Sequence, residues 1–208
     1  MISQFFTIGL LLLFAVMLPG PDFAMVTKNT LFHSRRAGVF TTLGIGVSNL
    51  IHMTYCSLGL AMVIANSLVL FSIIKYIGAA YLIYLGVNSL LAKTPEHLMP
   101  NNKQLKKSTQ SDWASFHQGF LCNLLNPKAT LFFLALFTTI IKPNISNYWL
   151  IIFVIEMFFI VTLWFLSLTF ILSHPRVTSV LEKAEKYIAK VLGVFLIGFG
   201  IALTFVRR

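Results

Sequence analysis

Ionisable side chains are scarce in this chain, and acidic ones are the scarcest. Only 11% of the 208 residues are charged, and Asp and Glu together number 6 against 16 Lys and Arg. Ordinary soluble domains carry about 25% charged and about 45–50% apolar residues, whereas 57% of this chain is hydrophobic. The shortage of charge excludes a soluble enzyme, and the abundance of apolar residues excludes a disordered chain.

Cysteines and short catalytic motifs are also few. Cys56 and Cys122 both lie in apolar stretches, so no disulfide framework is expected. The sequence contains no HExxH, no G-x-S-x-G, no phosphate-binding loop and no Cys–His metal spacing. It therefore predicts no cofactor, no metal and no enzymatic activity, and it argues against ATP-driven transport by this chain alone.

Long uncharged runs dominate what is present. No Asp, Glu, Lys or Arg occurs from Ala37 to Ile74. Because one transmembrane helix needs about 20 apolar residues, this run holds most of two spans, with a break expected near Asn66-Ser67. The other spans are expected near residues 3–19, 68–91, 116–141, 147–172 and 187–206. The sequence predicts an all-α integral membrane protein of about six helices without a soluble domain, although broken helices would change the count to five or seven.

The surplus of positive charge lies in alternate loops, and the N-terminus lacks the basic segment of a signal peptide. Eleven cations fall in the first, third and fifth loops: Lys28, Arg35, Arg36, Lys93, Lys103, Lys106, Lys107, Arg176, Lys183, Lys186 and Lys190. The opposite side has four: Lys75, Lys142, Arg207 and Arg208. The first span is therefore expected to be retained, and the positive-inside rule predicts that both termini lie outside the cytoplasm, so the positive charge requires no nucleic-acid partner.

Two polar segments interrupt the apolar pattern. Residues 93–115 contain Pro95 and Pro100 and are expected to be a cytoplasmic linker. The linker divides one transmembrane domain, 1–208, into halves at 1–92 and 116–208. Residues 174–190 are amphipathic, which fits a helix on the inner leaflet and equally a solvated connector.

Two spans carry proline motifs that indicate an internal repeat. Pro19-Gly20-Pro21-Asp22 interrupts the first span and Asn126-Pro127-Lys128 the fourth, at an offset of 106 residues that also superposes the second span on the fifth. Since each half has three spans, the halves are expected to insert in opposite orientations. Corresponding Pro/Gly-interrupted segments in inverted repeats point to a transport site at the midplane.

Each proline motif is expected to unwind its span. Proline removes a backbone donor and breaks the helical ladder, which hydrocarbon tolerates only where protein or a cavity satisfies the backbone. In the first span the free amides would begin a half-helix at 23–33 and form an anion site. The alternative is a pair of purely structural kinks.

Charged groups within spans cost about 2.5–3.5 kcal/mol each on insertion scales and mark pathways or relays. The candidates are Asp22, Lys128 and Glu156, with His52 as a titratable companion. Asp22 and Lys128 occupy equivalent repeat positions. They are expected either to form a salt bridge between the broken helices or to bind a substrate's ammonium and carboxylate.

The remaining polar candidates have a structural and a functional interpretation. Glu156 has no local partner, and burial disfavours a charged carboxylate, which suits a proton carrier and equally a protonated, hydrogen-bonded side chain. His52 shares a face with small residues, so it is expected either to pack between helices or to relay protons. Asn49, Asn123 and Asn126 could supply amides to a polar substrate.

The combination of these motifs resembles the LysE/RhtB amino-acid exporter family over essentially the whole chain. The matching residues are Gln4, Pro19–Phe23, Ser34–Gly38, Gly44–Gly46, His52, Gly59–Leu60, Gly119–Phe120, Asn123–Ala129, Glu156 and Gly198–Gly200. The resemblance is greatest to the homoserine/threonine-type branch. It implies a multi-pass exporter of amino acids or their derivatives in the bacterial inner membrane, driven by the proton gradient.

The leading hypothesis is export of amino acids by alternating access with proton antiport. The candidate substrate-binding residues are Pro19, Gly20, Pro21, Asp22, Asn49, Asn123, Asn126, Pro127 and Lys128. The candidate proton-coupling residues are Asp22, His52 and Glu156. The expected partners are an amino acid, protons, the lipid bilayer and a possible second copy of the chain. A solute or ion channel is the alternative, followed by a membrane-embedded enzyme using the three proton-coupling residues.

Overall fold

The computed structural model describes residues 2–91, 110–140 and 145–205, and within these ranges the regular elements are all helical. They are α1 (Ile2–Met17), α2 (Pro21–Lys28), the π-helical turn η1 (Asn29–His33), α3 (Arg35–Asn66), α4 (Leu68–Leu91), α5 (Asp112–Leu124), α6 (Pro127–Ile140), α7 (Asn147–Leu172) and α8 (Pro175–Thr204). The prediction of an all-α chain is confirmed.

Two helices in the described ranges are long and apolar enough to cross a membrane, namely α7 and Val69–Asn88 of α4. Two bent pairs pass the same test together, so up to four spans are recognised. Ser3–Met17 bends by 61° into Pro21–His33, and Asp112–Leu124 bends by 57° into Pro127–Thr139. The count of six spans stays a prediction.

Several predicted boundaries can be compared with the helix ends. The expected break between the second and third spans is confirmed, because α3 ends at Asn66 and α4 begins at Leu68. The fourth span was expected from residue 116, but α5 already begins at Asp112, since the Ser111 hydroxyl caps it by accepting from the amide of Ala114 at 3.2 Å. Residues 93–109 of the predicted linker lie outside the described residues.

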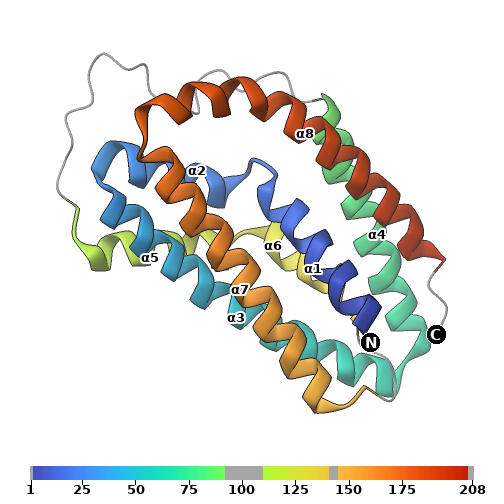
Figure 1. Cartoon of the computed structure of the whole chain (residues 1–208). Coiled ribbons are helices and arrows are strands. Elements are labelled where there is room, and N and C mark those ends of the chain that lie inside the picture. The colour runs from blue at the N-terminus through green and yellow to red at the C-terminus, as the bar shows by residue number, and fades with distance from the viewer. Residues whose placement is uncertain (1, 92–109, 141–144, 206–208) are drawn as a thin grey trace.

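The amphipathic segment 174–190 belongs to one long helix. Proline at the start favours helix initiation, and no glycine or further proline follows before Gly193, so α8 runs without a break from Pro175 to Thr204. Figure 1 shows its first turns crossing one end of the bundle before the helix passes alongside α4. The segment is therefore helical, and contact with the inner leaflet and a solvated connector both stay predictions.

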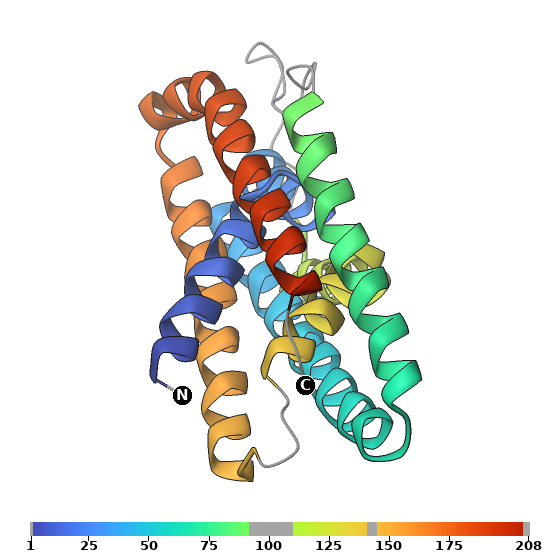
Figure 2. The same cartoon turned by 90° about the vertical axis from the view of Figure 1, so that its right-hand side faces the viewer.

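Helices α3 and α7 pack together on one side of the bundle and α4 and α8 on the other, and the broken pairs α1–α2 and α5–α6 pack against them (Figures 1 and 2). Helix α3 packs against α5 and α6, and α7 packs against α1 and α2. Glycine permits the closest of these approaches, since a Cβ on Gly44 would lie 2.8 Å from the backbone nitrogen of Phe120.

The two ends of the bundle differ in charge. Helix α1 begins and α8 ends toward the same end of the bundle (Figure 2). The opposite end carries Lys28, Arg35 and Arg36, and we call it the basic end. There Arg36 pairs with Asp112, with 2.6 Å between Nη2 and Oδ2. Which end faces the cytoplasm stays a prediction.

Candidate functional site

The two helix breaks meet in the interior of the bundle. In the first, residues 18–20 separate α1 from α2, and in the second, residues 125–126 separate α5 from α6. Pro21 and Pro127 are the first residues of the new helices. Proline suits this position because its fixed φ starts a helix and its missing N–H would have no helical partner there. Each span therefore restarts at its proline.

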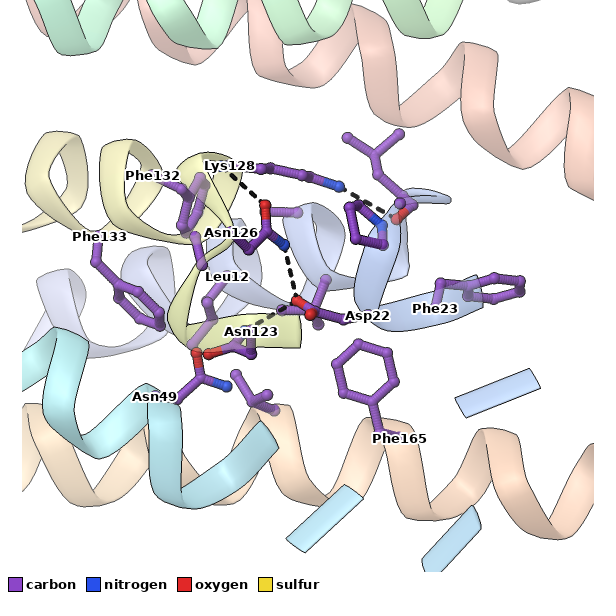
Figure 3. Close-up of a pocket in the computed structure, with 17 residues that line it drawn as sticks. Leu12, Asp22, Phe23, Asn49, Asn123, Asn126, Lys128, Phe132, Phe133 and Phe165 are labelled. Atoms are coloured by element: carbon purple, nitrogen blue, oxygen red, sulfur yellow. Dashed lines mark hydrogen bonds between the residues drawn. The ribbon is translucent and has the colours of Figure 1, made fainter. Parts of the chain in front are cut away.

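A charged side chain beside each break forms hydrogen bonds with the other break. Asp22 Oδ2 accepts hydrogen bonds from the side-chain amides of Asn123, at 2.9 Å, and Asn126, at 3.2 Å. In the opposite direction, Lys128 Nζ donates to the Leu18 carbonyl at 3.3 Å, near the end of α1 (Figure 3). The charged side chains that follow Pro21 and Pro127 thus join the two breaks.

Asp22 and Lys128 do not form the ion pair considered from the sequence. Both side chains are described, yet no nitrogen–oxygen distance between them falls within 4.0 Å. Each charge instead takes neutral partners on the facing break. The salt-bridge alternative is therefore not what joins the broken helices, and the two opposite charges line the same space separately.

The starts of the two new helices are capped differently. Asn126 Oδ1 accepts a hydrogen bond from the Lys128 amide at 2.9 Å, so the first turn of α6 is satisfied by a side chain. Gly20 holds the corresponding position before α2 and offers no cap, and a Cβ there would lie 3.1 Å from Lys128 Nζ. The start of α2 therefore combines uncapped amides, a positive helix end and a nearby ammonium.

A cavity of about 460 Å³, including its mouth, lies between the breaks. Seven predicted substrate-binding residues line it: Gly20, Pro21, Asp22, Asn49, Asn123, Asn126 and Lys128. Pro19 and Pro127 flank the breaks and are not among the lining residues. Two acceptors of lining residues, Asp22 Oδ1 and Asn123 Oδ1, are buried and have no hydrogen-bond partner in the described chain.

Apolar side chains complete the wall, and the sequence did not single them out. Phe132, Phe133 and Phe165 line the cavity together with Phe23 and Leu12 (Figure 3). Only Phe23 carried a signal, because it directly follows the first proline motif. For the others, hydropathy does not distinguish a cavity-facing phenylalanine from a lipid-facing one.

His52 lies beside the second break and does not line the cavity. It is 1% exposed, and its Nε2 lies 3.0 Å from the Asn123 carbonyl, which can only accept, so Nε2 carries the proton and donates. Its Nδ1 contacts the Tyr55 hydroxyl, which in turn lies 3.1 Å from Thr130 Oγ1. His52 therefore supports the end of α5 from α3, through partners that the sequence did not reveal.

Glu156 also lies apart from the cavity, in the contact between α7 and α1. It faces Gly9, where a Cβ would collide with Glu156 Oε1, and its Oε2 is buried without a hydrogen-bond partner in the described chain. It precedes the cavity-lining Val161 by five residues, or about 7.5 Å of helix. The three predicted proton-coupling residues therefore occupy three separate places.

Neither metal chemistry nor disulfide chemistry is apparent where the structure can be described. No group of three or more His, Cys, Asp or Glu side chains could hold a metal ion within residues 2–91, 110–140 and 145–205. Cys56 on α3 and Cys122 on α5 are free thiols.

Comparison with known proteins gives one consistent result. The family profile described as LysE type translocator matches residues 13–206. The uncharacterized membrane protein YrhP of Bacillus subtilis (strain 168) is 39% identical over 191 residues, covering 89% of this chain and 91% of that protein. The threonine efflux proteins of Salmonella typhi and Escherichia coli (strain K12) are each 29% identical over the full length of both chains.

No solved structure matches the chain significantly, so these sequence matches carry the comparison. The matched residues include both helix breaks and every residue that lines the cavity except Leu12. The chain belongs to the LysE type translocator family.

Proposed function

We propose that this chain exports small neutral amino acids across the bacterial inner membrane, with the cavity between the two helix breaks as the substrate site. The observation that carries the proposal is the pair of unpartnered acceptors, Asp22 Oδ1 and Asn123 Oδ1, beside an uncapped helix start and Lys128. The relatives named threonine efflux proteins support the same class of substrate.

The two groups of acceptors and donors match the two ends of an amino-acid zwitterion. An ammonium has three donors, and the unpartnered oxygens of Asp22 and Asn123 would accept two of them. A carboxylate fits the start of α2, where backbone amides, the helix dipole and Lys128 favour an anion. Since a buried polar atom without a partner is unfavourable, a zwitterion stabilises the site.

The apolar wall limits the substrate side chain. Phe132, Phe133 and Phe165 surround the space left beside the polar groups. A short aliphatic or hydroxylated side chain, as in threonine or homoserine, fits such a wall, whereas a charged side chain would be buried without a partner.

The packing of the two halves supports alternating access between inverted repeats. Contacts between α3 and α5 are matched by contacts between α7 and α1, and those between α3 and α6 by those between α7 and α2. Inverted repeats related by a two-fold axis in the membrane plane would exchange the members of each pair. Transporters of this class move one repeat against the other around a fixed midplane site.

Proton antiport is the second part of the proposal. Asp22, the substrate's acidic partner, would lose its charge on protonation and release the ammonium. Glu156 suits a proton carrier because its half-buried carboxyl lies between α1 and α7, with the buried Oε2 unpaired in the described chain. A movement of the second break would change the environment of His52, because His52 is hydrogen-bonded to the Asn123 carbonyl.

Counterflow in proteoliposomes tests the substrate site. Labelled threonine or homoserine should accumulate against a gradient and saturate, which a pore cannot produce. Asp22→Asn should lower counterflow by about 100-fold, since it removes the charge that binds the ammonium. Asp112→Asn, at the exposed basic end, is the matched control and should transport normally. Full activity of Asp22→Asn would overturn the proposed role of this carboxylate.

Imposed pH gradients test the coupling. An inward proton gradient should accelerate efflux of preloaded amino acid, and Glu156→Gln should abolish the acceleration while substrate affinity is kept. Efflux that ignores the gradient in the parent chain would eliminate antiport, and an unaltered response in Glu156→Gln would remove this residue from the coupling.

A further inference from the structure

Polar side chains are distributed unevenly on the two sides of the cavity. Toward the end opposite the basic end, Met157 and Phe153 lie one and two turns beyond the cavity-lining Val161 on α7, and both are fully buried. Beside the cavity and from there toward the basic end lie five buried threonines on α2, α3, α7 and η1 that no step above uses: Thr27, Thr30, Thr42, Thr162 and Thr169. We call this set the threonine seam.

Three helix faces lead from the cavity into the seam. Side chains three, four or seven residues apart share one face of a helix. Thr27 and Thr30 therefore follow the cavity-lining Phe23, and Thr169 follows the cavity-lining Phe165. On α3, Thr42 lies seven residues before the cavity-lining Asn49.

Close contacts at two glycines of α3 show that these faces meet. A Cβ on Gly38 would collide with Thr30 Oγ1 and would lie 2.8 Å from Thr169 Cγ2. A Cβ on Gly46 would lie 3.0 Å from Thr162 Oγ1. Thr42 lies one helical turn from each glycine. The seam therefore follows one face of α3, and the contacts at Gly38 close it.

The hydroxyls inside this closure lack hydrogen-bond partners. Thr30 and Thr169 donate to carbonyls of their own chain segment, Val26 at 2.7 Å and Phe165 at 2.9 Å. In contrast, the hydroxyls of Thr27, Thr42 and Thr162 are buried and make no hydrogen bond in the described chain. Valine would pack in the same volume without an unpaired hydroxyl, so dry packing alone does not account for threonine at these positions.

We infer that the threonine seam is the basic-end half of the permeation path, closed in this structure where Gly38 meets Thr30 and Thr169. When α2 and α7 separate from α3, the three unpartnered hydroxyls hydrogen-bond water and the polar head of the solute as it passes to or from Asp22. The inference rests on the proposed function only in taking the cavity as the substrate site.

Two neighbouring threonines of α3 provide a matched test. Thr41 and Thr42 are both 0% exposed. Thr41 belongs to the contact with α5, and its hydroxyl donates to Ala37 and accepts from Asn29, each at 2.8 Å. Thr42 is in the seam and unpartnered. Because the two threonines are equally buried and of the same residue type, a difference in the behaviour of their variants would indicate that only Thr42 lies on the permeation path.

Thiol labelling is the first measurement. A small charged methanethiosulfonate should modify Thr42→Cys about tenfold faster than Thr41→Cys, because opening of the path exposes only the seam. The parent chain, with its native thiols, gives the background rate. An excess of transported amino acid should slow labelling of Thr42→Cys. Equal rates for the two cysteines would overturn the inference.

Valine variants are the second measurement. Thr42→Val should lower efflux about tenfold while melting temperature in detergent and amino-acid affinity are kept, because the folded state loses no hydrogen bond. Thr41→Val should lower the melting temperature instead. Normal efflux of Thr42→Val would also overturn the inference. Failure of the parent chain to bind any amino acid would count against the proposed function, whereas labelling of Thr42→Cys requires no ligand.

Discussion

The two helix breaks have corresponding residues at the same positions, but only the second break has a capped helix start. Gly20 and Asn126 occupy the same position before a helix that begins with proline, and Asp22 and Lys128 follow at the same position after it. Asn126 caps its own helix, whereas Gly20 leaves α2 uncapped and makes room for Lys128 Nζ. The second break is satisfied within the protein, and the first is open to an anion.

The second break also has more support from its surroundings. His52 donates to the Asn123 carbonyl at the end of α5, and the amides of Asn123 and Asn126 both reach Asp22. At the first break, the Leu18 carbonyl accepts a hydrogen bond from Lys128 Nζ at 3.3 Å, and this donor belongs to the second break. The second break therefore has the more extensive hydrogen bonding, and its side chains donate to the first break, whose helix start remains uncapped.

The largest effect is expected from making the first break like the second. Gly20→Asn should cap the amides of α2 and displace Lys128 Nζ, so we expect counterflow to fall by about 100-fold with little change in the melting temperature, since Asn and Gly caps differ by a few tenths of a kcal/mol. Gly59→Ala is the control, because a Cβ there meets nothing within 4 Å. Retained transport in Gly20→Asn would contradict an anion site at this helix start.

The second largest effect is expected from uncapping the second break. Asn126→Ala removes both the cap on Lys128 and one amide from Asp22. We expect about 1 kcal/mol loss of stability together with about tenfold slower transport. Asn126→Ser should restore the stability by capping again, but not the transport, because serine cannot reach Asp22. Thermal unfolding in detergent measures the capping role, and counterflow measures the role in transport. If Asn126→Ser regained both stability and transport, the two roles would not be separate.

An intermediate effect is expected where the first broken span meets Glu156. Gly9→Ala places a Cβ against Glu156 Oε1, so the carboxyl must move. Proton-driven efflux should fall several-fold while counterflow without a pH gradient is kept, because the cavity is about 7.5 Å of helix away. Gly198→Ala is the control, since a Cβ at Gly198 has no neighbour within 4 Å. An equal loss of both activities would mean that the substitution disturbs packing alone.

The smallest effect is expected from weakening the support of the second break. His52→Leu removes the donor to the Asn123 carbonyl, and an interhelical side-chain hydrogen bond in a membrane protein contributes about 0.6 kcal/mol on average. His52→Gln keeps an amide donor and should recover the lost stability. If His52 only positions α5, the pH profile of transport in His52→Gln is unchanged. A lost pH dependence would assign His52 to the proton path.

Local signals in the sequence were sufficient for the helices and their interruptions. The break at Ser67 and both proline motifs were predicted from hydropathy and from proline chemistry, which act on neighbouring residues. The start of α5 was placed four residues too late, because the cap at Ser111 was read as part of a polar linker. The last span was separated from its amphipathic extension, although no breaker residue divides them.

The arrangement of the site could be predicted only in part. Asp22, Lys128 and the asparagines were singled out because polar groups are rare and costly in a membrane, and the structure brings them to one cavity. Their partners were not predictable, since opposite charges at equivalent positions suggested an ion pair that does not form. The aromatic wall and the threonine seam gave no usable signal, because apolar residues and threonines also occur throughout lipid-facing helices.

The sequence by itself determined, through its long uncharged runs, its prolines and its scarce charges, that the protein is helical, where its spans break and which few polar groups lie in them. Those properties follow from the chemistry of each residue and its neighbours. Only the tertiary structure decided that Lys128 holds the Leu18 carbonyl, that two asparagines share Asp22, and that three buried threonine hydroxyls have no partner. These contacts join, or fail to join, groups on separate helices, and no local pattern records which atoms face each other once the two halves pack.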